Sequence, residues 1–339
     1  MRLLPSCIFV CGLASYASLQ AQSSRLDLLN HNRPIVDAHN CYPYAGEWAD
    51  RLDRALGTGY PVGIEQDLAW GVDKATGKGR PVVSHSKETT GNEPTLRDYF
   101  FEQVRPRVEQ ALRENNRAQW PLITVHFDFK DNRPELLRAV WDLLGEYEGW
   151  ITTAPKTADP HTLAGFDAGP LLVLTEDNDA QELVFFTDLA VGAKLRLFGS
   201  AHTASIPAAS REERVHLAAT VAPEKLLTER PTNYRRWWNN SWAEVEEGGQ
   251  AKAREWTAAD DARLRALVDH AHRLGFWIRF YTLDGFNAAE NRGWDQGYNF
   301  GSREAALARW KAAARLGVNL IATDQFEDLA TTLKRTETK

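Results

Sequence analysis

Short apolar runs alternate with amphipathic segments along most of the chain. Eight runs have the length of strands, and they cover residues 35–39, 62–68, 81–85, 122–130, 171–175, 195–199, 276–283 and 319–323. Between them lie longer segments such as residues 134–144, whose apolar residues recur at helical spacing and fall on one face. Strands that alternate with helices predict an α/β fold.

Two later helices have recognisable ends. Thr257 precedes a segment with acids in its first turn, which is typical of a helix N-cap, and this helix is expected to run to Leu274 before Gly275. A further helix is expected over residues 304–316 and is followed by Gly317. Glycine is favoured just after a helix because the chain often turns there with a positive φ.

The α/β pattern allows an open doubly wound sheet or a closed barrel. Neither GxGxxG nor GxxxxGK[ST] follows the first strand, so the nucleotide-binding open sheets lose their main support. Residues 57–59, 71–79 and 237–252 are interpreted as loops, and the chain has no convincing internal repeat. We expect one domain, a (β/α)₈ TIM barrel over residues 22–339.

Polar side chains interrupt the strands at positions that share a face. In residues 122–130, His126, Asp128 and Lys130 are two positions apart, so they point to the same side of the strand. The same spacing, or a place at a strand end, recurs at Asp37, His39, Glu65, Asp67, His85 and Asp324. Because the carboxyl ends of barrel strands meet at one mouth, these side chains are expected to converge there.

The residue types at this mouth indicate phosphoryl chemistry. Glu65, Asp67 and Asp128 offer hard oxygen ligands that suit Mg²⁺ or Ca²⁺, and without a cation the three carboxylates would repel one another. His39 and His85 are able to move protons near neutral pH. A divalent cation beside two histidines is the equipment that stabilises extra charge on a phosphodiester.

The ordered series of motifs resembles a known superfamily. The motifs are His39-Asn, then Glu65-Gln-Asp67, then Val-Val-Ser-His85, then Asp128-Phe-Lys130. In this order they are similar to the glycerophosphodiester phosphodiesterase and phosphatidylinositol phospholipase C superfamily of PLC-like phosphodiesterases. The branch that the chain resembles most is that of the altered-inheritance-of-mitochondria protein 6 group, whose opening reads His-Asn-Asp-Tyr. The resemblance covers residues 35–329.

The resemblance implies a TIM barrel, a divalent metal and histidine acid–base catalysis. Carried over, His39 and His85 are the catalytic pair. The metal ligands are Glu65, Asp67 and Asp128, and Lys130 contacts phosphate. Two positions depart from the family pattern: Asp128 stands where many relatives have Glu, and Cys41 replaces the acid that follows His-Asn in the branch.

Several further residues have two interpretations. Arg279 and Tyr281 share an inward face and are expected to bind substrate, whereas His126 is interpreted as a hydrogen-bonded core histidine. Asp324 either orients a histidine or caps the following turn. The aromatic stretch 234–242 is either a rim that stacks on a sugar or headgroup, or, the interpretation favoured here, a loop that packs across the mouth.

Net charge and the N-terminal segment indicate which partners and which cellular location to expect. A net charge of −6 argues against nucleic acid as a partner. Arg2 and the largely apolar residues 3–19 predict a signal peptide over residues 1–21, and therefore a secreted or periplasmic protein with no membrane span after cleavage. The expected partner is a small-molecule or lipid-headgroup phosphodiester, with peripheral membrane contact left open.

Two other functions remain open from the sequence. Asp37-Ala-His39 with Asp324 is similar to the ligands of a metal-dependent amidohydrolase, although such enzymes carry His-x-His after the first strand. A non-catalytic secreted barrel that binds carbohydrate or a headgroup through its aromatic stretch is the alternative outside enzymes. All five residues of the histidine pair and acid group are present, which favours an enzyme.

Overall fold

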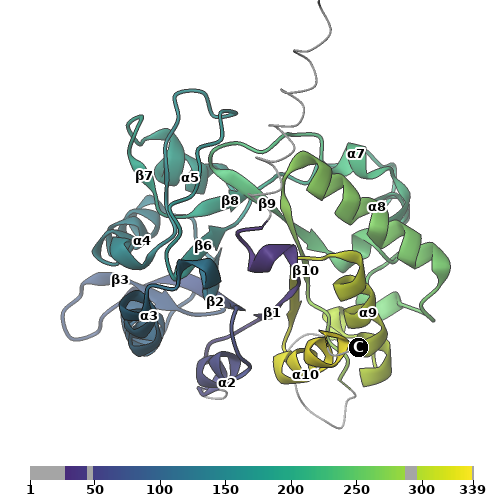
Figure 1. The fold of residues 1–339 in the computed structure, drawn as a ribbon, viewed down its shortest axis with the longest axis horizontal. Coiled ribbons are helices and arrows are strands. Elements are labelled where there is room, and N and C mark those ends of the chain that lie inside the picture. The colour runs from purple at the N-terminus through teal and green to yellow at the C-terminus, as the bar shows by residue number, and fades with distance from the viewer. Residues whose placement is uncertain (1–26, 44–48, 287–295, 338–339) are drawn as a thin grey trace, which may run out of the picture.

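A ring of parallel strands surrounded by helices forms the part of the chain that the computed structural model describes, residues 27–43, 49–286 and 296–337 (Figure 1). Eight strands of these residues lie in the order β1-β11-β10-β9-β8-β6-β4-β2, and pairing of β1 with β2 closes the ring. The predicted (β/α)₈ barrel is confirmed. The strands are β1 Ile35–Ala38, β2 Val62–Val72, β4 Ile123–Phe129, β6 Leu171–Thr175, β8 Phe198–Ser200, β9 Arg235–Ser241, β10 Trp277–Tyr281 and β11 Leu320–Thr323.

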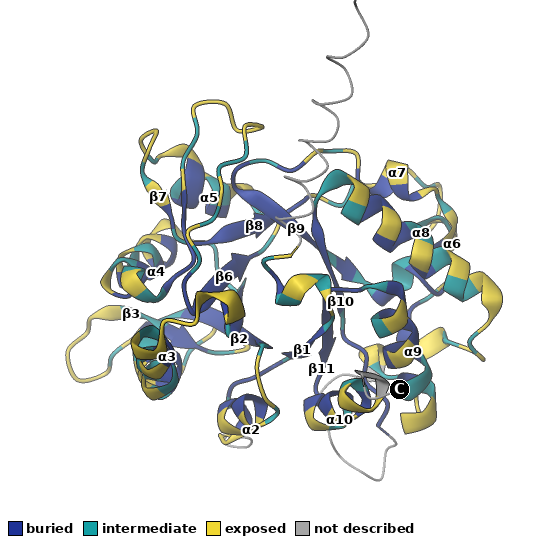
Figure 2. Cartoon of the chain, in the orientation of Figure 1, coloured by how far each residue is buried: buried dark blue, intermediate teal, exposed yellow. Residues whose placement is uncertain are grey.

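Helices pack on the outside of the ring. They are α2 Arg51–Gly57, α3 Glu102–Glu114, α4 Pro134–Glu146, α5 Asp179–Glu182, α6 Arg211–Thr220, α7 Pro223–Leu226, α8 Ala258–Leu274, α9 Arg303–Leu316 and α10 Phe326–Glu337. Figure 2 shows that each long helix is buried on the side that faces the strands and exposed on the other. Burial of the apolar stripe is therefore what holds each helix to the barrel.

Short elements complete the described chain. A π-helical turn at Arg97–Phe101 leads into α3, and a second follows α5 at Leu183–Thr187. Single 3₁₀ turns occupy Asn30–Asn32, Arg117–Gln119, Glu148–Trp150, Trp242–Glu244, Gln250–Lys252 and Gln296–Tyr298. β5 Ala154–Pro155 pairs with β7 Lys194–Leu195 outside the barrel.

One predicted barrel strand does not belong to the barrel, and one barrel strand was predicted as a loop, so the predicted number of eight strands is still right. The run at residues 81–85 was expected to be a barrel strand, but β3 Gly79–Val83 pairs antiparallel with β2 and forms a hairpin beside the ring. The eighth barrel strand is instead β9, within the stretch 234–242 that was expected to be a loop. Trp237 and Trp238 are fully buried in it, because a parallel barrel strand is covered on both faces.

The predicted helix ends are confirmed. Thr257 caps α8 by accepting a hydrogen bond from the backbone N–H of Asp260, whose side chain in turn accepts from the Thr257 backbone N–H. Gly275 and Gly317 end α8 and α9 with φ values of 95° and 90°, which a side chain with a Cβ rarely adopts. Within the described residues, the structure has no helix long and apolar enough to cross a membrane.

Candidate active site

A cavity of about 490 Å³ opens at the carboxyl ends of the barrel strands. Seven of the eight predicted site residues line it, and the eighth, Asp67, lies in its wall and contacts two of them. The seven are His39, Glu65, His85, Asp128, Lys130, Arg279 and Tyr281. The mouth of a parallel barrel thus gathers side chains that are more than 240 residues apart in the sequence.

A buried charge triad forms the floor of the cavity. The Arg279 guanidinium donates from Nε to Asp37, and its Nη2 lies 2.6 Å from Oε2 of Glu65. Its Nη1 also donates to the Asn239 side chain at 3.1 Å. Gly63 makes room for the triad, because a Cβ at this position would lie 2.5 Å from the Asp37 carboxylate. Arg279 therefore holds Glu65 in place, and its predicted contact with substrate stays a prediction.

His39 follows β1 and is held by two carboxylates. Its Nδ1 lies 3.2 Å from Oδ1 of Asp324, and its Nε2 lies 3.7 Å from Oε2 of Glu65. Burial alone lowers the pKa of His39, but the negative charges of Glu65 and Asp324 outweigh it and raise this pKa to about 9. Nη2 of Arg51 lies 2.9 Å from the same Asp324 oxygen. Of its two interpretations, Asp324 thus has the first: it orients a histidine.

His85 is held in a different way. It follows the hairpin strand β3, its side chain is 46% exposed, and its Nδ1 lies 2.9 Å from Oδ2 of Asp67. The hydroxyl of Tyr42 lies 2.7 Å from the same carboxylate oxygen, and Lys130 Nζ is also 2.7 Å from it. Asp67 is fully buried, so it fixes the ring of His85 from within the wall.

Three carboxylates converge beside these histidines. Glu65, Asp67 and Asp128 each offer an oxygen within 4.8 Å of the others, which is close enough for one metal ion to contact all three. Lys130 Nζ bridges Asp67 and Asp128 at 2.7 Å from each. Burial and the charge of Asp67 raise the pKa of Asp128 to about 6, so one ammonium does not neutralise the group.

The donor set fits a divalent cation. Oδ1 of Asp67 is buried and has no hydrogen-bond partner among the described residues, although a buried carboxylate oxygen is costly to leave without one. Three carboxylates are the hard ligands that Mg²⁺ and Ca²⁺ prefer. These residues would therefore provide such an ion with three carboxylate ligands.

A further histidine lies on β4, next to Glu65 of β2. His126 is 1% exposed and packs edge-on against Trp237 at 4.9 Å, as expected of a core histidine. Its Nε2, however, contacts the carboxylate of Glu176, which is partly exposed and lines the cavity. Burial opposes the charged form of His126, but Glu176 outweighs this effect and raises the pKa of the imidazole.

Two tyrosines form an aromatic part of the cavity wall beside β10, four strands around the ring from β4. Tyr281 packs edge-on against Tyr298 with ring centroids 6.1 Å apart, and both line the cavity. The Arg279 guanidinium lies 5.8 Å from the centroid of the Tyr281 ring. This placement is compatible with the predicted contact between Tyr281 and substrate, which stays a prediction.

Some functional candidates were missed from the sequence. Asn40 and Tyr42 contact the acids of the site, and both stand at matching positions of the His-Asn-Asp-Tyr opening, which is the signal that could have found them. Glu176 follows β6, so the rule of charged residues at strand ends also applied to it. Arg51 reaches Asp324 from α2, and nothing in its local sequence indicates this contact.

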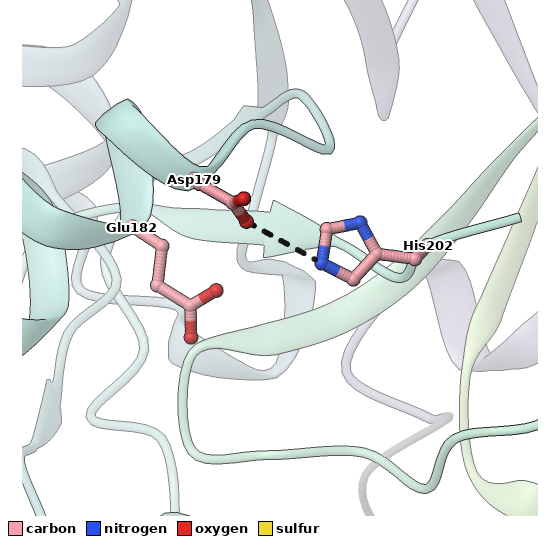
Figure 3. A group of neighbouring side chains, drawn as sticks. All are labelled: Asp179, Glu182 and His202. Atoms are coloured by element: carbon pink, nitrogen blue, oxygen red, sulfur yellow. Dashed lines mark ion pairs between the residues drawn. The ribbon is translucent and has the colours of Figure 1, made fainter.

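A second group with metal-ligand spacing lies at the rim, where Asp179, Glu182 and His202 approach one another (Figure 3). His202 Nε2 lies 3.7 Å from Oδ1 of Asp179, the ion pair drawn in Figure 3. The guanidinium of Arg235 lies 2.5 Å from Glu182 and 3.2 Å from Asp177. This group therefore already contains its own cation.

Comparison with known proteins adds little. No family model and no curated protein matches the chain. The chain is similar to two solved structures of glycerophosphodiester phosphodiesterases from Parabacteroides distasonis ATCC 8503. One is 12% identical with a TM-score of 0.41, covering 94% of this chain and 92% of that chain. The other is 13% identical with a TM-score of 0.47, covering 90% and 98%.

The chain is also similar to Plasmodium falciparum HPPK-DHPS, at 9% identity and a TM-score of 0.45, covering 97% of this chain and 55% of that chain. TM-scores below 0.5 carry no argument about either fold or function. The barrel is established by its strand pairing.

Proposed function

We propose that the protein is a divalent-metal-dependent phosphodiesterase that hydrolyses a glycerophosphodiester or a phospholipid headgroup. The observation that carries this proposal is the meeting of two histidines with three carboxylates and a lysine at one cavity. Buried acids that repel one another beside a histidine of raised pKa are typical of a catalytic site.

Glu65, Asp67 and Asp128 would hold the metal, which when bound supplies a Lewis acid for a phosphoryl oxygen. Lys130 keeps its charge, because Asp67 and Asp128 outweigh the effect of burial and raise the pKa of its ammonium. It is therefore able to neutralise an oxygen of an anionic diester at the edge of the acid group.

His39 is suited to be the general acid. With a pKa raised to about 9 it carries a proton at neutral pH, and Asp324 fixes its Nδ1. Its Nε2 then donates the proton to the leaving alcohol oxygen.

His85 is suited to be the general base. Its Nδ1 is engaged by Asp67, so Nε2 is the nitrogen that would take a proton from the attacking water. The ring is half exposed, which lets it meet a water that enters the cavity with the substrate. A buried acid and an accessible base are thus provided by different environments.

The two alternatives lose their support. A carbohydrate-binding barrel depended on an aromatic rim, but Trp237, Trp238 and Trp242 are fully buried, the first two of them in the barrel strand β9. A metal-dependent amidohydrolase would need Asp324 among the metal ligands, and its carboxylate is instead engaged by His39 and Arg51.

Hydrolysis of bis(p-nitrophenyl) phosphate and glycerophosphocholine by the purified protein tests the proposal. Activity should vanish after EDTA and return with Mg²⁺, Ca²⁺ or Mn²⁺, and His85→Ala should lower it by about 10²- to 10⁴-fold while keeping the wild-type circular dichroism. Wild-type turnover by His85→Ala would remove the acid–base assignment. No turnover of either substrate with any of the cations would contradict the phosphodiesterase proposal.

We also propose that residues 1–21 are a signal peptide and that residues 22–339 form the secreted or periplasmic protein. The support is the charge of Arg2 followed by the apolar residues 3–19, which lie outside the described residues. N-terminal sequencing of the exported protein should begin near Gln22, and an intact Met1 on the protein recovered outside the cytoplasm would contradict cleavage.

A further inference from the structure

A tight turn follows β1 and brings two polar side chains to the same place. Asn40 has a φ of 50°, in the left-handed region that costs free energy for residues other than glycine, although Asn tolerates it best. The backbone N–H of Tyr42 donates to the Asn40 carbonyl at 2.9 Å, and that of Cys41 donates to the Glu65 carbonyl at 3.2 Å. The turn is thus fastened both to itself and to β2.

The Tyr42 hydroxyl lies at the centre of this arrangement. It is 2.6 Å from Oδ1 of Asn40, 2.7 Å from Oδ2 of Asp67 and 2.9 Å from Nδ1 of His85. Tyr42 is fully buried. A phenol has one proton, so it donates to one of these partners and accepts from another. The three contacts together hold the side chains of Asn40, Asp67 and His85 in one orientation around the hydroxyl.

The chain of contacts continues to the other histidine. Nδ2 of Asn40 lies 3.3 Å from Oδ1 and 3.4 Å from Oδ2 of Asp324, which fixes the amide so that its oxygen faces Tyr42. Asp324 in turn accepts from Nδ1 of His39. The phenol is therefore one contact from His85 and three contacts from His39.

We propose that Tyr42 is a positioning residue that couples the two histidines of the site. Its hydroxyl aligns His85 directly and aligns His39 through Asn40 and Asp324, so that acid and base keep one relative geometry. This inference rests on the proposed phosphodiesterase function for its consequence in turnover, but not for the physical coupling.

Another buried tyrosine provides the contrast. Tyr234 is as fully buried as Tyr42, and its ring stacks on Phe186 with centroids 5.7 Å apart. Its hydroxyl has no hydrogen-bond partner among the described residues. Tyr234 fills space, whereas Tyr42 joins three functional side chains, so Tyr234→Phe is the matched control for Tyr42→Phe.

The first test is a pair of conservative variants. Tyr42→Phe should lower kcat on bis(p-nitrophenyl) phosphate by about 10- to 100-fold, the usual loss when an outer partner of a catalytic group is removed, with little change in KM. Tyr234→Phe should keep wild-type kcat. Asn40→Gly, which keeps the left-handed turn, should lower kcat as much as Tyr42→Phe does. The double variant should lower kcat no further than either single variant.

A double-mutant cycle separates positioning from general loss of structure. In a His85→Ala background, Tyr42→Phe should lower kcat by less than about 3-fold, because residues that act as a unit have strongly non-additive effects. Full additivity with His85→Ala and Asn40→Gly, or equal kcat in Tyr42→Phe and the wild type, would overturn the proposal while leaving the phosphodiesterase function standing.

A spectroscopic readout does not depend on turnover. The Nδ1–H proton resonances of His39 and His85, assigned by their loss in the two His→Ala variants, should both shift in Tyr42→Phe and neither should shift in Tyr234→Phe. An unchanged His39 resonance in Tyr42→Phe would overturn the coupling. If the wild type hydrolysed no diester, the proposed function would fail and this spectrum alone would decide the inference.

Discussion

Two acidic groups at the barrel mouth have the spacing of metal ligands, and only one of them is suited to hold a metal. The inner group, Glu65, Asp67 and Asp128, lies where β2 pairs with the carboxyl-terminal half of β4 and is largely buried. The rim group, Asp179, Glu182 and His202, includes a side chain, that of Asp179, that is 93% exposed.

The groups differ in how deeply their residues are buried: two of the three inner residues are buried, and none of the three rim residues is. At the rim, the Arg235 guanidinium approaches the carboxylates of Asp177, Asp179 and Glu182 within 4 Å. In the inner group Lys130 bridges Asp67 and Asp128 and Arg279 binds Glu65, and yet the pKa of Asp128 remains raised to about 6 by burial and by Asp67. Spacing alone therefore does not define a metal site; carboxylates that are buried together and still repel one another do.

The largest expected effect distinguishes the histidines of the two groups. His39→Ala should lower kcat for bis(p-nitrophenyl) phosphate by about 10²- to 10⁴-fold, because general acid catalysis contributes a factor of this size. His202→Ala should leave kcat unchanged, because its imidazole belongs to the rim. Comparable losses in the two variants would show that the rim group takes part in turnover.

Removing the guanidinium should turn the rim group into an unbalanced one. Arg235→Gln leaves Glu182 and Asp177 without their cation, and we expect a loss of at least about 2 kcal/mol in the free energy of unfolding. This is less than the roughly 3–5 kcal/mol of a fully buried broken pair, because both acids keep some water contact.

Urea unfolding with and without CaCl₂ measures this change. Ca²⁺ should restore more stability to Arg235→Gln than it adds to the wild type, because it would replace the lost positive charge at the rim. Equal unfolding free energies for Arg235→Gln and the wild type would mean that the guanidinium does not balance these carboxylates.

A smaller effect is expected for a metal ligand. Asp128→Asn should lower the affinity of the protein for the activating cation by about 10- to 100-fold, the loss typical of a change at a metal site or its close partners. Asp179→Asn should leave the cation concentration for half-maximal activity unchanged. Asp128 is chosen over Glu65 because Glu65 also binds Arg279, so its substitution changes the floor of the cavity as well.

The smallest effect concerns pH. Burial, and then the charge of Asp324, raise the pKa of Asp284 from 3.8 to about 8. The folded protein therefore keeps this proton where the unfolded chain has lost it, so the contribution of Asp284 to stability falls as pH rises from about 4 to about 8.

Asp284→Asn should remove that contribution, because an amide oxygen still accepts from the Thr323 hydroxyl and the Asp324 backbone N–H. The unfolding free energy of the wild type should therefore fall more between pH 5 and pH 8 than that of Asp284→Asn. Parallel pH profiles for the two proteins would contradict the raised pKa.

The barrel and most of the site were predictable because strand alternation is local. In residues 122–130 every second side chain is polar, and the structure places His126, Asp128 and Lys130 on the cavity. The missed strand β9 has consecutive tryptophans, which hide the alternation, since a strand covered on both faces needs no polar side. The hairpin strand β3 has the same apolar run as a barrel strand, and only pairing distinguishes them.

The contacts of the site depend on closure of the barrel, which local sequence does not encode. Asp37 and Arg279 are neighbours because β1 and β10 both pair with β11, and Arg51 reaches Asp324 across the contact of α2 with α10. Sequence periodicity gave the face of each side chain but not its partner. Engagement of Arg279 by two carboxylates could be learned only from the assembled ring.

The most direct test of the central claim is Mn²⁺ binding by electron paramagnetic resonance, measured on the chelator-treated protein alongside turnover of bis(p-nitrophenyl) phosphate. We predict one tightly bound ion per chain at the inner group, lost in Asp67→Asn and kept in Asp179→Asn, with turnover rising in proportion to occupancy. Full turnover by the metal-free protein, or an ion that is lost in Asp179→Asn and kept in Asp67→Asn, would contradict the account.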